Sequence, residues 1–445
     1  MKMTKYKLSE LVEVTRGASL SGQFYAEEGK LIRLTLGNFN MNGGGFKENT
    51  SKTDLYFTGT VRDEFILNEG DIITPLTEQS LGLLGTTARI PESGKYIQSQ
   101  DVALVRCKKG LLDPNFCYYL ISSSIVRQQL SAAAQQTKIR HTSPEKIKDC
   151  TVWVPDFDVQ KNIGRILTDI DNKIAINRQI NDNLEEMAKQ LYDYWFVQFD
   201  FPNEEGMPYK SSGGEMVWNE KLKREIPKGW EVKHLGDIIE ANRGISYNTS
   251  SISGGGVPMI NLASFNVNGT YKDAGIKTYN GSYTKEKVLK PFDLVLCNTQ
   301  QTAIDFSKDI IGKAFLVPDV FEGDIVSSHH INTIKTEDYY KAYIAYLSNT
   351  SHFHKYAAGC CSGTNILGLD FNSFSQYKME IPPVYLLEEF QKIIIDIVKR
   401  ESVIIKENKT LTKLRDELLP LLMNGQATVN YHLSASFLSS LILYR

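Results

Sequence analysis

The sequence has 445 residues, of which 42% are hydrophobic and 23% charged, and a formal net charge of −2. This composition is typical of an ordinary soluble protein long enough for two domains with connecting elements, and the net charge does not by itself indicate a nucleic-acid-binding protein. We expect no membrane segment, because no apolar run approaches the roughly 20 residues that span a bilayer and the N-terminus lacks the apolar core of a signal peptide. We expect the protein to be in a reducing cytoplasm, because its six cysteines form no CxxC pair.

One short segment occurs twice in the chain. Residues 8–17 read LSELVEVTRG and residues 235–244 read LGDIIEANRG, at an offset of 235 − 8 = 227 residues. The offset returns where GTTARIPE (85–92) matches GKAFLVPD (312–319), since 312 − 85 is also 227. A recurring offset with small insertions between the matches indicates an internal duplication, and two copies favour two similar domains.

In chain order, the duplication and the changes of hydrophobic period divide the sequence into six segments. We predict a first domain over 1–155, a long helix over 156–200, a linker over 201–227, a second domain over 228–384, a second long helix over 385–429 and an atypical tail over 430–445.

Each domain is predicted to be β-rich with some helix. Short apolar runs such as DVALVRC and CTVWVP in the first domain, and FDLVLCN and GKAFLVP in the second, alternate with Gly, Asn and Pro, which is typical of strands and turns. Residues 115–130 and 337–349 are predicted as helices at corresponding places. The fold class is therefore α+β.

After each domain, apolar residues recur every seven positions, which is typical of a coiled coil. We expect the two helices to pack antiparallel, with the domains related by approximate two-fold symmetry. Asn177 interrupts the pattern: it is either a partly exposed polar position or a buried residue that fixes the register of the helices. The predicted helix–helix seam consists of Ile163, Ile170, Asn177, Leu184 and Leu191 on the first helix and Ile397, Ile404, Leu411 and Leu418 on the second.

Motifs for catalysis are missing from the sequence. It contains no GxxxxGK[ST] phosphate loop, no GxGxxG after a strand, no GxSxG and no HExxH. His329–His330, His352, His354 and Cys360–Cys361 match no standard metal spacing, so we predict no metal site.

Polar loops at matching places in the two domains instead predict DNA recognition. Arg, Lys, Asn and Gln can read base edges, while Ser and Thr can hold phosphates; the other interpretation is that these are ordinary hydrophilic loops. The candidate DNA-binding residues are Arg16, Gln79, Gln136, Thr137, Lys138, Arg140, His141, Arg243, Gln300, Gln301, Thr364 and Asn365.

Three segments carry a resemblance to a known family. Residues 192–231 (YDYWFVQFDFPNEEGMPYKSSGGEMVWNEKLKREIPKGWE) resemble the segment between the two target-recognition domains of type I restriction–modification specificity subunits. Residues 226–238 (IPKGWEVKHLGDI) resemble the usual start of the second domain, and residues 414–429 (LRDELLPLLMNGQATV) the usual end of the second helix. The resemblance covers residues 5 to about 430, and the tail 430–445 departs from it.

This resemblance implies a non-catalytic subunit that binds an asymmetric, bipartite site in double-stranded DNA, one domain reading each part. The helices would set the spacing and dock methyltransferase subunits, two of them by the family's pattern, and restriction subunits would join that core. S-adenosylmethionine and ATP with Mg²⁺ would belong to these partners, so no cofactor is expected on this chain. A DNA-binding adaptor outside restriction, and a coiled-coil scaffold without a DNA role, remain alternatives; neighbouring genes and DNA-binding assays would discriminate between them.

Overall fold

The computed structural model describes residues 2–41, 44–78, 81–133, 140–252, 254–301, 308–363 and 366–427, with backbone only at Gln301. Within these ranges the chain forms two units: unit 1 comprises Met1–Ile174 and Thr410–Arg445, and unit 2 comprises Ala175–Lys409. Unit 1 is thus made of two separate stretches of chain, and each unit contains one predicted domain together with part of each long helix. The two units are described separately below.

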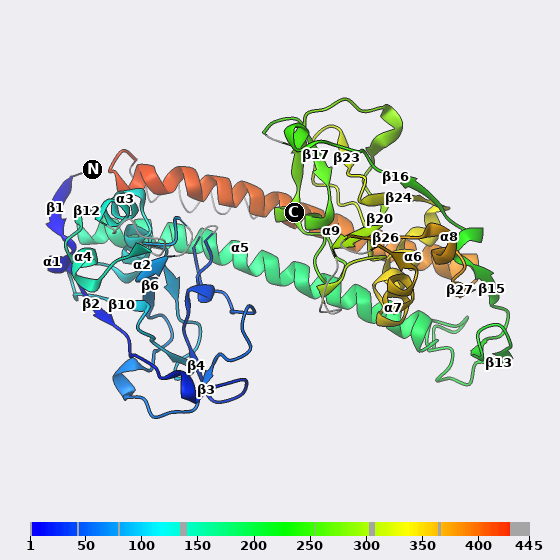
Figure 1. Cartoon of the computed structure of the whole chain (residues 1–445), viewed down its shortest axis with the longest axis horizontal. Helices are drawn as coiled ribbons and strands as arrows, with labels where there is room; N and C mark the ends of the chain where they lie inside the picture. Colours follow the sequence, from blue (N-terminus) through cyan, green and yellow to red (C-terminus); the bar gives the residue numbers. More distant parts are fainter. Residues whose placement is uncertain are drawn as a thin grey trace. The chain divides into compact units, whose positions relative to one another are not determined.

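Unit 1 combines short strands with helices (Figure 1). Its helices are α1 (Leu8–Leu11), α2 (Pro114–Ile121), α3 (Ser124–Ala133), α4 (Pro144–Lys148) and the first part of α5 (Phe157–Tyr192), with the last part of α9 (Val384–Met423). Its strands are β1 (Met3–Lys7), β2 (Val12–Arg16), β3 (Tyr25–Ala26), β4 (Leu31–Arg33), β5 (Tyr56–Phe57), β6 (Ile72–Pro75), β7 (Thr77–Glu78), β8 (Ala88–Arg89), β9 (Tyr96–Ile97), β10 (Val102–Cys107), β11 (Arg140–His141) and β12 (Thr151–Pro155).

Unit 2 holds the remaining elements. Its own helices are α6 (Asp338–Asn349), α7 (Ser351–Gly359) and α8 (Phe371–Phe374). Its strands are β13 (Met216–Asn219), β14 (Arg224–Pro227), β15 (Glu231–His234), β16 (Glu240–Arg243), β17 (Val257–Ile260), β18 (Lys277–Tyr279), β19 (Val288–Leu289), β20 (Leu294–Cys297), β21 (Thr299–Gln301), β22 (Ala314–Leu316), β23 (Ile325–Ser327), β24 (Ile331–Lys335), β25 (Cys361–Ser362), β26 (Ile366–Leu369) and β27 (Lys378–Ile381).

The sheets of the two units follow the same plan. Unit 1 has a four-stranded sheet in the order β2-β10-β6-β8, and unit 2 has one in the order β16-β24-β20-β22. The pair β1-β12 corresponds to β15-β27, and β7-β11 corresponds to β21-β26. β4 pairs in parallel with β9 in unit 1, and β17 pairs in parallel with β23 in unit 2. The duplication read from the sequence therefore extends to the order of the strands, and the α+β class is confirmed.

The helical segments of unit 1 pack antiparallel. Ile163 of α5 lies in one buried cluster with Leu422 of α9, and further along α5, Ile170 and Ile174 pack with Leu411. Moving forward along α5 therefore means moving back along α9. Tyr119 of α2 joins this packing, because its hydroxyl donates a 2.6 Å hydrogen bond to Asp171 of α5.

The helical segments of unit 2 pack in the same sense. Asn177 is 1% exposed, and its amide donates to the Glu407 carboxylate at 2.7 Å and to the Asn408 side chain at 3.0 Å. The interpretation of Asn177 as an exposed polar position is therefore wrong. Near the other end of α5, Tyr192 packs on Phe390 with ring centroids 6.1 Å apart.

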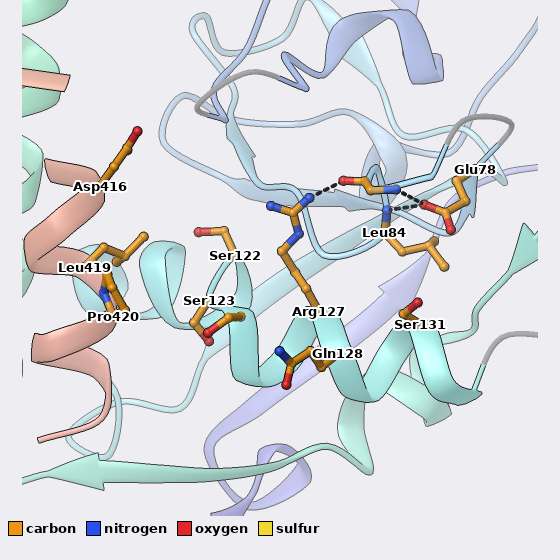
Figure 2. Close-up of a pocket in the computed structure, with 12 residues that line it drawn as sticks. Glu78, Leu84, Ser122, Ser123, Arg127, Gln128, Ser131, Asp416, Leu419 and Pro420 are labelled. Atoms are coloured by element: carbon orange, nitrogen blue, oxygen red, sulfur yellow. Dashed lines mark hydrogen bonds between the residues drawn. The ribbon is translucent and has the colours of Figure 1, made fainter. Parts of the chain in front are cut away.

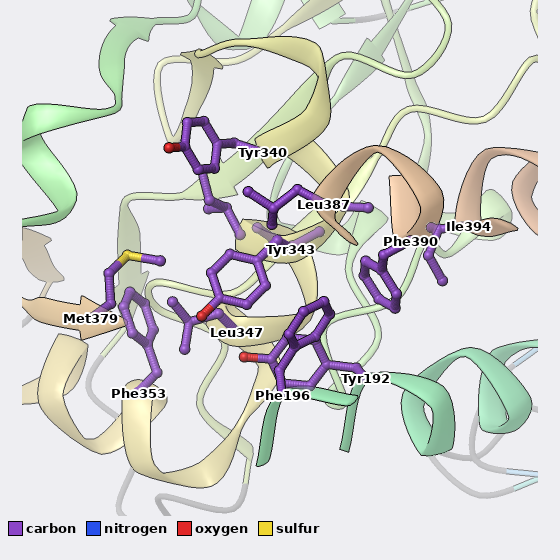
Figure 3. Packing of buried hydrophobic residues seen from close by; sticks show 14 of the residues in the cluster. Tyr192, Phe196, Tyr340, Tyr343, Leu347, Phe353, Met379, Leu387, Phe390 and Ile394 are labelled. Atoms are coloured by element: carbon purple, nitrogen blue, oxygen red, sulfur yellow. The ribbon is translucent and has the colours of Figure 1, made fainter. Parts of the chain in front are cut away.

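The core of unit 2 surrounds this helix end. Figure 3 shows Phe196, which follows α5, close to Tyr343 of α6 and to Phe390 of α9. Their ring centroids are 4.9 and 5.0 Å from that of Phe196, with edge-to-face geometry. Such aromatic pairs add about 0.5–1.5 kcal/mol each beyond the area they bury, so the end of α5 is firmly attached to the second domain.

Two predictions about local structure were wrong. The helix expected over 115–130 is two helices, α2 and α3, because the chain turns at Ser122 and Ser123, whose hydroxyls donate to backbone carbonyls of α2. The segment expected as a linker, 201–227, contains the hairpin β13-β14. Phe201, in the same segment, stacks on Trp230 at 5.4 Å, so this segment is part of the core of unit 2.

Candidate nucleic-acid interface

The repeated Arg–Gly pair occupies the same structural position in both units. Arg16 ends strand β2, and its Nε donates a 2.8 Å hydrogen bond to the carbonyl of Gln100. Arg243 ends strand β16, and its Nε donates a 2.9 Å hydrogen bond to the carbonyl of His329. Both side chains are exposed. Each domain therefore presents a guanidinium group whose direction is fixed by a backbone carbonyl.

The glycines of these pairs are required by a close approach of two backbones. A Cβ on Gly17 would overlap the carbonyl oxygens of Gln98 and Ser99, and a Cβ on Gly244 would overlap those of Ser327 and Ser328. Only glycine lets the chain pass this close to a neighbouring strand. The glycines of the repeated segment are thus required for packing, and the arginines beside them remain the candidates for recognition.

Arg140 was predicted as a DNA-binding residue of a polar loop, but the structure places it in strand β11. Its side chain is 18% exposed and forms a 3.0 Å ion pair with Glu78, whose side chain is 2% exposed. The guanidinium also donates to the backbone carbonyl and, at 3.0 Å, to the hydroxyl of Ser131 at the end of α3. The pairing of β7 with β11 places Arg140 directly opposite Glu78 and explains the ion pair.

Glu78 was not among the predicted residues, yet it organises the chain that follows β7. Its Oε2 accepts hydrogen bonds from the backbone N–H groups of Gly82, Leu83 and Leu84 at 3.1, 2.9 and 3.0 Å. Figure 2 shows Glu78 beside this turn. The sequence contains a signal for it: residues 77–80 read TEQS and residues 298–302 read NTQQT, so Glu78 and Gln300 each follow a threonine.

Gln300 is 8% exposed and does not lie on an open loop. It belongs to β21, where it lies opposite Leu367 of β26, and its Oε1 accepts a hydrogen bond from the backbone N–H of Ile310. Gln301 continues β21 opposite Ile366. The predicted polar loops after the two strands therefore begin with strand residues.

The other predicted residues divide into two groups. His141 is exposed on β11, opposite Thr77. The remaining predicted residues lie outside the described part of the chain: Gln79, Gln136, Thr137, Lys138, Thr364 and Asn365. The structure thus brings Arg16, Arg140 and His141 into one domain and Arg243 and Gln300 into the other.

Unit 1 contains a cavity of about 510 Å³ beside Glu78 (Figure 2). Glu78 and Leu84 line one side, and Arg127 of α3 lies between them and the other walls. Arg127 donates a hydrogen bond to the carbonyl of Gly82. The remaining lining residues are Gly82, Ser122, Ser123, Ser124, Gln128, Ser131, Asp416, Leu419 and Pro420.

The adjacent histidines of unit 2, His329 and His330, pack against each other. The rings of His329 and His330 lie 3.9 Å apart, and burial, followed by the neighbouring His329 and Arg243, lowers the pKa of His330 to about 4. His330 is therefore neutral near pH 7. Among the described residues, no group of three or more His, Cys, Asp or Glu side chains could hold a metal ion.

Comparisons with known proteins agree with the duplicated fold. Residues 1–186 and 227–416 match the family model described as "Type I restriction modification DNA specificity domain". The MjaIX specificity subunit of Methanocaldococcus jannaschii is 23% identical over 335 residues, which are 72% of this chain and 71% of that protein. The HindI specificity subunit of Haemophilus influenzae is 24% identical over 388 residues, 74% of this chain and 81% of that protein.

A solved structure shows the same fold. The type I restriction–modification system S subunit from M. genitalium superposes with a TM-score of 0.57 at 16% identity, over 95% of this chain and 96% of that one. In the described part of this chain, no helix is long and apolar enough to cross a membrane. The two matches to one family model, placed on two units with the same strand order, identify this chain as a member of the type I restriction–modification specificity subunit family.

Proposed function

We propose that the chain is the sequence-specific DNA-binding subunit of a type I restriction–modification complex and that each domain reads one part of a bipartite, asymmetric site in double-stranded DNA. The observation that carries this proposal is the repetition of one four-stranded sheet with its neighbouring strand pairs, each copy with an exposed arginine held by a backbone carbonyl at the same strand end. Arginines oriented in this way suit contacts with phosphates or guanine edges. Arg16, His141 and Arg243 are the described candidates for such contacts.

Exchange of the first domain tests this division of labour. Replacing residues 5–155 with the corresponding domain of another family member, and sequencing the methylome of cells that carry the complex, is expected to change one half of the methylated motif. The second half should stay as it is in the wild type. A simultaneous change of both halves would contradict independent reading by the two domains.

The long helices are proposed to set the distance between the two half-sites and to dock the partner subunits. In both units the segments of α5 and α9 pack antiparallel, so a heptad added to both helices adds about 10 Å at about 1.5 Å per residue. We expect this insertion to lengthen the unspecified spacer without altering either half-site. An unchanged spacer would refute this role.

An exposed apolar stripe on α5 and the turn that follows it is proposed as part of the methyltransferase docking surface. Ile176, Ile180, Met187 and Tyr194 are 53, 38, 60 and 38% exposed, and their spacing of four and seven residues places them on one face, away from the packed side of the helix. Exposed apolar side chains grouped in this way mark interaction surfaces.

A charge placed on the stripe tests docking. Met187→Glu is expected to weaken assembly with the methyltransferase subunit at least about tenfold, because burying an unpaired carboxylate in an interface is costly. Ala175→Glu, on another exposed face of the same helix, is the matched control and should assemble normally. Equal assembly of both variants would remove the stripe from the interface.

The chemistry is proposed to reside on the partners. The chain would contribute DNA recognition and assembly, while methyltransferase and restriction subunits would carry S-adenosylmethionine and ATP with Mg²⁺, in the cytoplasm. The purified chain alone is then expected to show neither methylation nor cleavage of DNA, and methylation should appear when the methyltransferase subunit is added. Methylation by the chain alone would contradict this assignment.

A further inference from the structure

Glu78 and Gln300 occupy equivalent places in the two domains. Each lies in the strand that directly follows an inner strand of the four-stranded sheet: β7 follows β6 in unit 1, and β21 follows β20 in unit 2. Each is preceded by a threonine and is buried, and the register pairs Glu78 with Arg140 and Gln300 with Leu367. The two domains thus place an acid opposite a cation in one case and an amide opposite an apolar residue in the other.

Both side chains accept hydrogen bonds from backbone N–H groups further along the chain. The Glu78 carboxylate accepts N–H groups from three successive residues, Gly82 to Leu84, and the Gln300 amide oxygen accepts the N–H group of Ile310. A buried carboxylate oxygen and a buried amide oxygen can both accept hydrogen bonds of this type. The two residues therefore perform the same task with different charge.

The difference in charge explains the difference across the strand pair. A carboxylate with a side chain only 2% exposed needs a cation, and Arg140 supplies one at 3.0 Å. The neutral amide of Gln300 needs none, so Leu367 can lie opposite it. Arg140 also binds the end of α3 at Ser131, while Arg127 of α3 binds the carbonyl of Gly82. Hydrogen bonds thus connect α3 both to Gly82 and to Arg140.

We infer that Glu78 and Gln300 are equivalent positioning residues: Glu78 holds the backbone of Gly82 to Leu84, and Gln300 holds that of Ile310, in the form in which each domain reads DNA. Arg140 then serves by neutralising Glu78 rather than by contacting DNA. This inference rests on the proposed function. It predicts that the neutral pair of the second domain can replace the charged pair of the first, although either single replacement is harmful.

The test is a double-mutant cycle in the complete methyltransferase complex. The variants are Glu78→Gln, Arg140→Leu and the two together, and the readout is the ratio of Kd values for DNA altered in the first half-site and for cognate DNA. We expect each single variant to lose discrimination by about tenfold or more, and the double variant to return to within about threefold of the wild type. Discrimination at the second half-site should stay constant in all variants.

Arg106→Leu, which removes an exposed arginine from β10 of the same domain, is the matched control for lost positive charge. Two results would overturn the inference. In one, the double variant loses discrimination by the product of the losses measured for the two single variants. In the other, Arg140→Leu and the double variant lose affinity equally for cognate and unrelated DNA, with a smaller salt dependence, which would make Arg140 a phosphate contact.

The design separates this inference from the proposed function. If the wild-type complex does not distinguish its methylated motif from unrelated DNA, the proposed function fails whatever the variants do. If the wild type discriminates and the double variant is not rescued, only the positioning role fails. Thermal unfolding of each complex identifies variants that bind poorly because they are unfolded, and the ratio of Kd values is taken below those temperatures.

Discussion

Replacement of Asp171 by alanine is expected to loosen the attachment of the first domain to its helices. One carboxylate oxygen of Asp171 accepts the Tyr119 hydroxyl at 2.6 Å, and the other pairs with Arg415 at 2.8 Å. Burial, and next the charge of Asp171, raises the pKa of Tyr119, so the phenol remains a proton donor at all ordinary pH values. A single side chain on α5 thus connects α2 and α9 within unit 1.

The size of the effect follows from these contacts. A hydrogen bond to a charged group contributes about 1.5–3 kcal/mol, and Tyr119 would lose such an acceptor. The ion pair adds less, about 0.5–1 kcal/mol, because the Asp171 side chain is 28% exposed and Arg415 keeps Asp416 as a partner. We therefore expect a local destabilisation of about 2–4 kcal/mol for Asp171→Ala, and about half of that for Asp171→Asn, which retains an acceptor.

Hydrogen-exchange mass spectrometry measures this locally. Peptides from α2 and from the last part of α9 should exchange faster in Asp171→Ala, while peptides from α6 in unit 2 serve as an internal reference. Asp169→Ala, an exposed position on the same helix, should change protection by less than about 0.5 kcal/mol. A change below about 1 kcal/mol in the α2 peptides of Asp171→Ala would refute this account of the attachment.

Three further outcomes are expected. Gly17→Ala, or its counterpart Gly244→Ala, should destabilise its own domain by about 1–3 kcal/mol or more in thermal unfolding, because the added Cβ overlaps backbone carbonyls; a neutral result would mean that the strands can separate freely. Asn177→Ala should lower the protection of the helix segments around it by about 2–3 kcal/mol through its two lost hydrogen bonds, and unchanged exchange would count against a role in register. Burial, and then Glu185, raises the pKa of Glu401, so its contribution to stability is present below the unfolded pKa near 4.5 and is lost as pH rises through the folded value. Glu401→Gln should therefore raise the melting temperature at pH 8, and should raise it much less at pH 5. An equal gain at both pH values would contradict a raised pKa of Glu401.

The seven-residue hydrophobic period predicted the positions of the two long helices well, but it predicted less well which residues of each helix are buried. Ile163, Ile170 and Leu411 are buried as expected, whereas Ile397 and Ile404 are only half-buried. Leu184, Leu191 and Leu418 are half-buried as well. A straight α-helix drifts by about 20° per heptad relative to a strict seven-residue repeat, so the buried line on each helix moves away from the residues that a fixed spacing selects. The domains also cover part of each helix, which a two-helix pattern does not include.

The candidate site was predictable only in part, for a similar reason. Arg16 and Arg243 could be found because a contiguous segment is repeated around them. Glu78 could not be recognised as the partner of Arg140, since 62 residues separate them (140 − 78) and only the strand pairing brings them together. A charged residue in a polar segment looks the same in sequence whether it binds DNA or a buried carboxylate.

The divided composition of unit 1 has a consequence for synthesis of the protein. Unit 2 is continuous in the chain, whereas unit 1 requires the stretch that begins at Thr410. During translation the first domain leaves the ribosome first, yet Leu422 and Met423, which belong to its apolar core, are made only after unit 2. The first domain therefore waits with an uncovered apolar face while the 235 residues of unit 2 are added (409 − 174). A nascent chain stalled before Thr410 would hold a finished second unit and an unfinished first one, and would be a natural substrate for chaperones that bind exposed apolar surface.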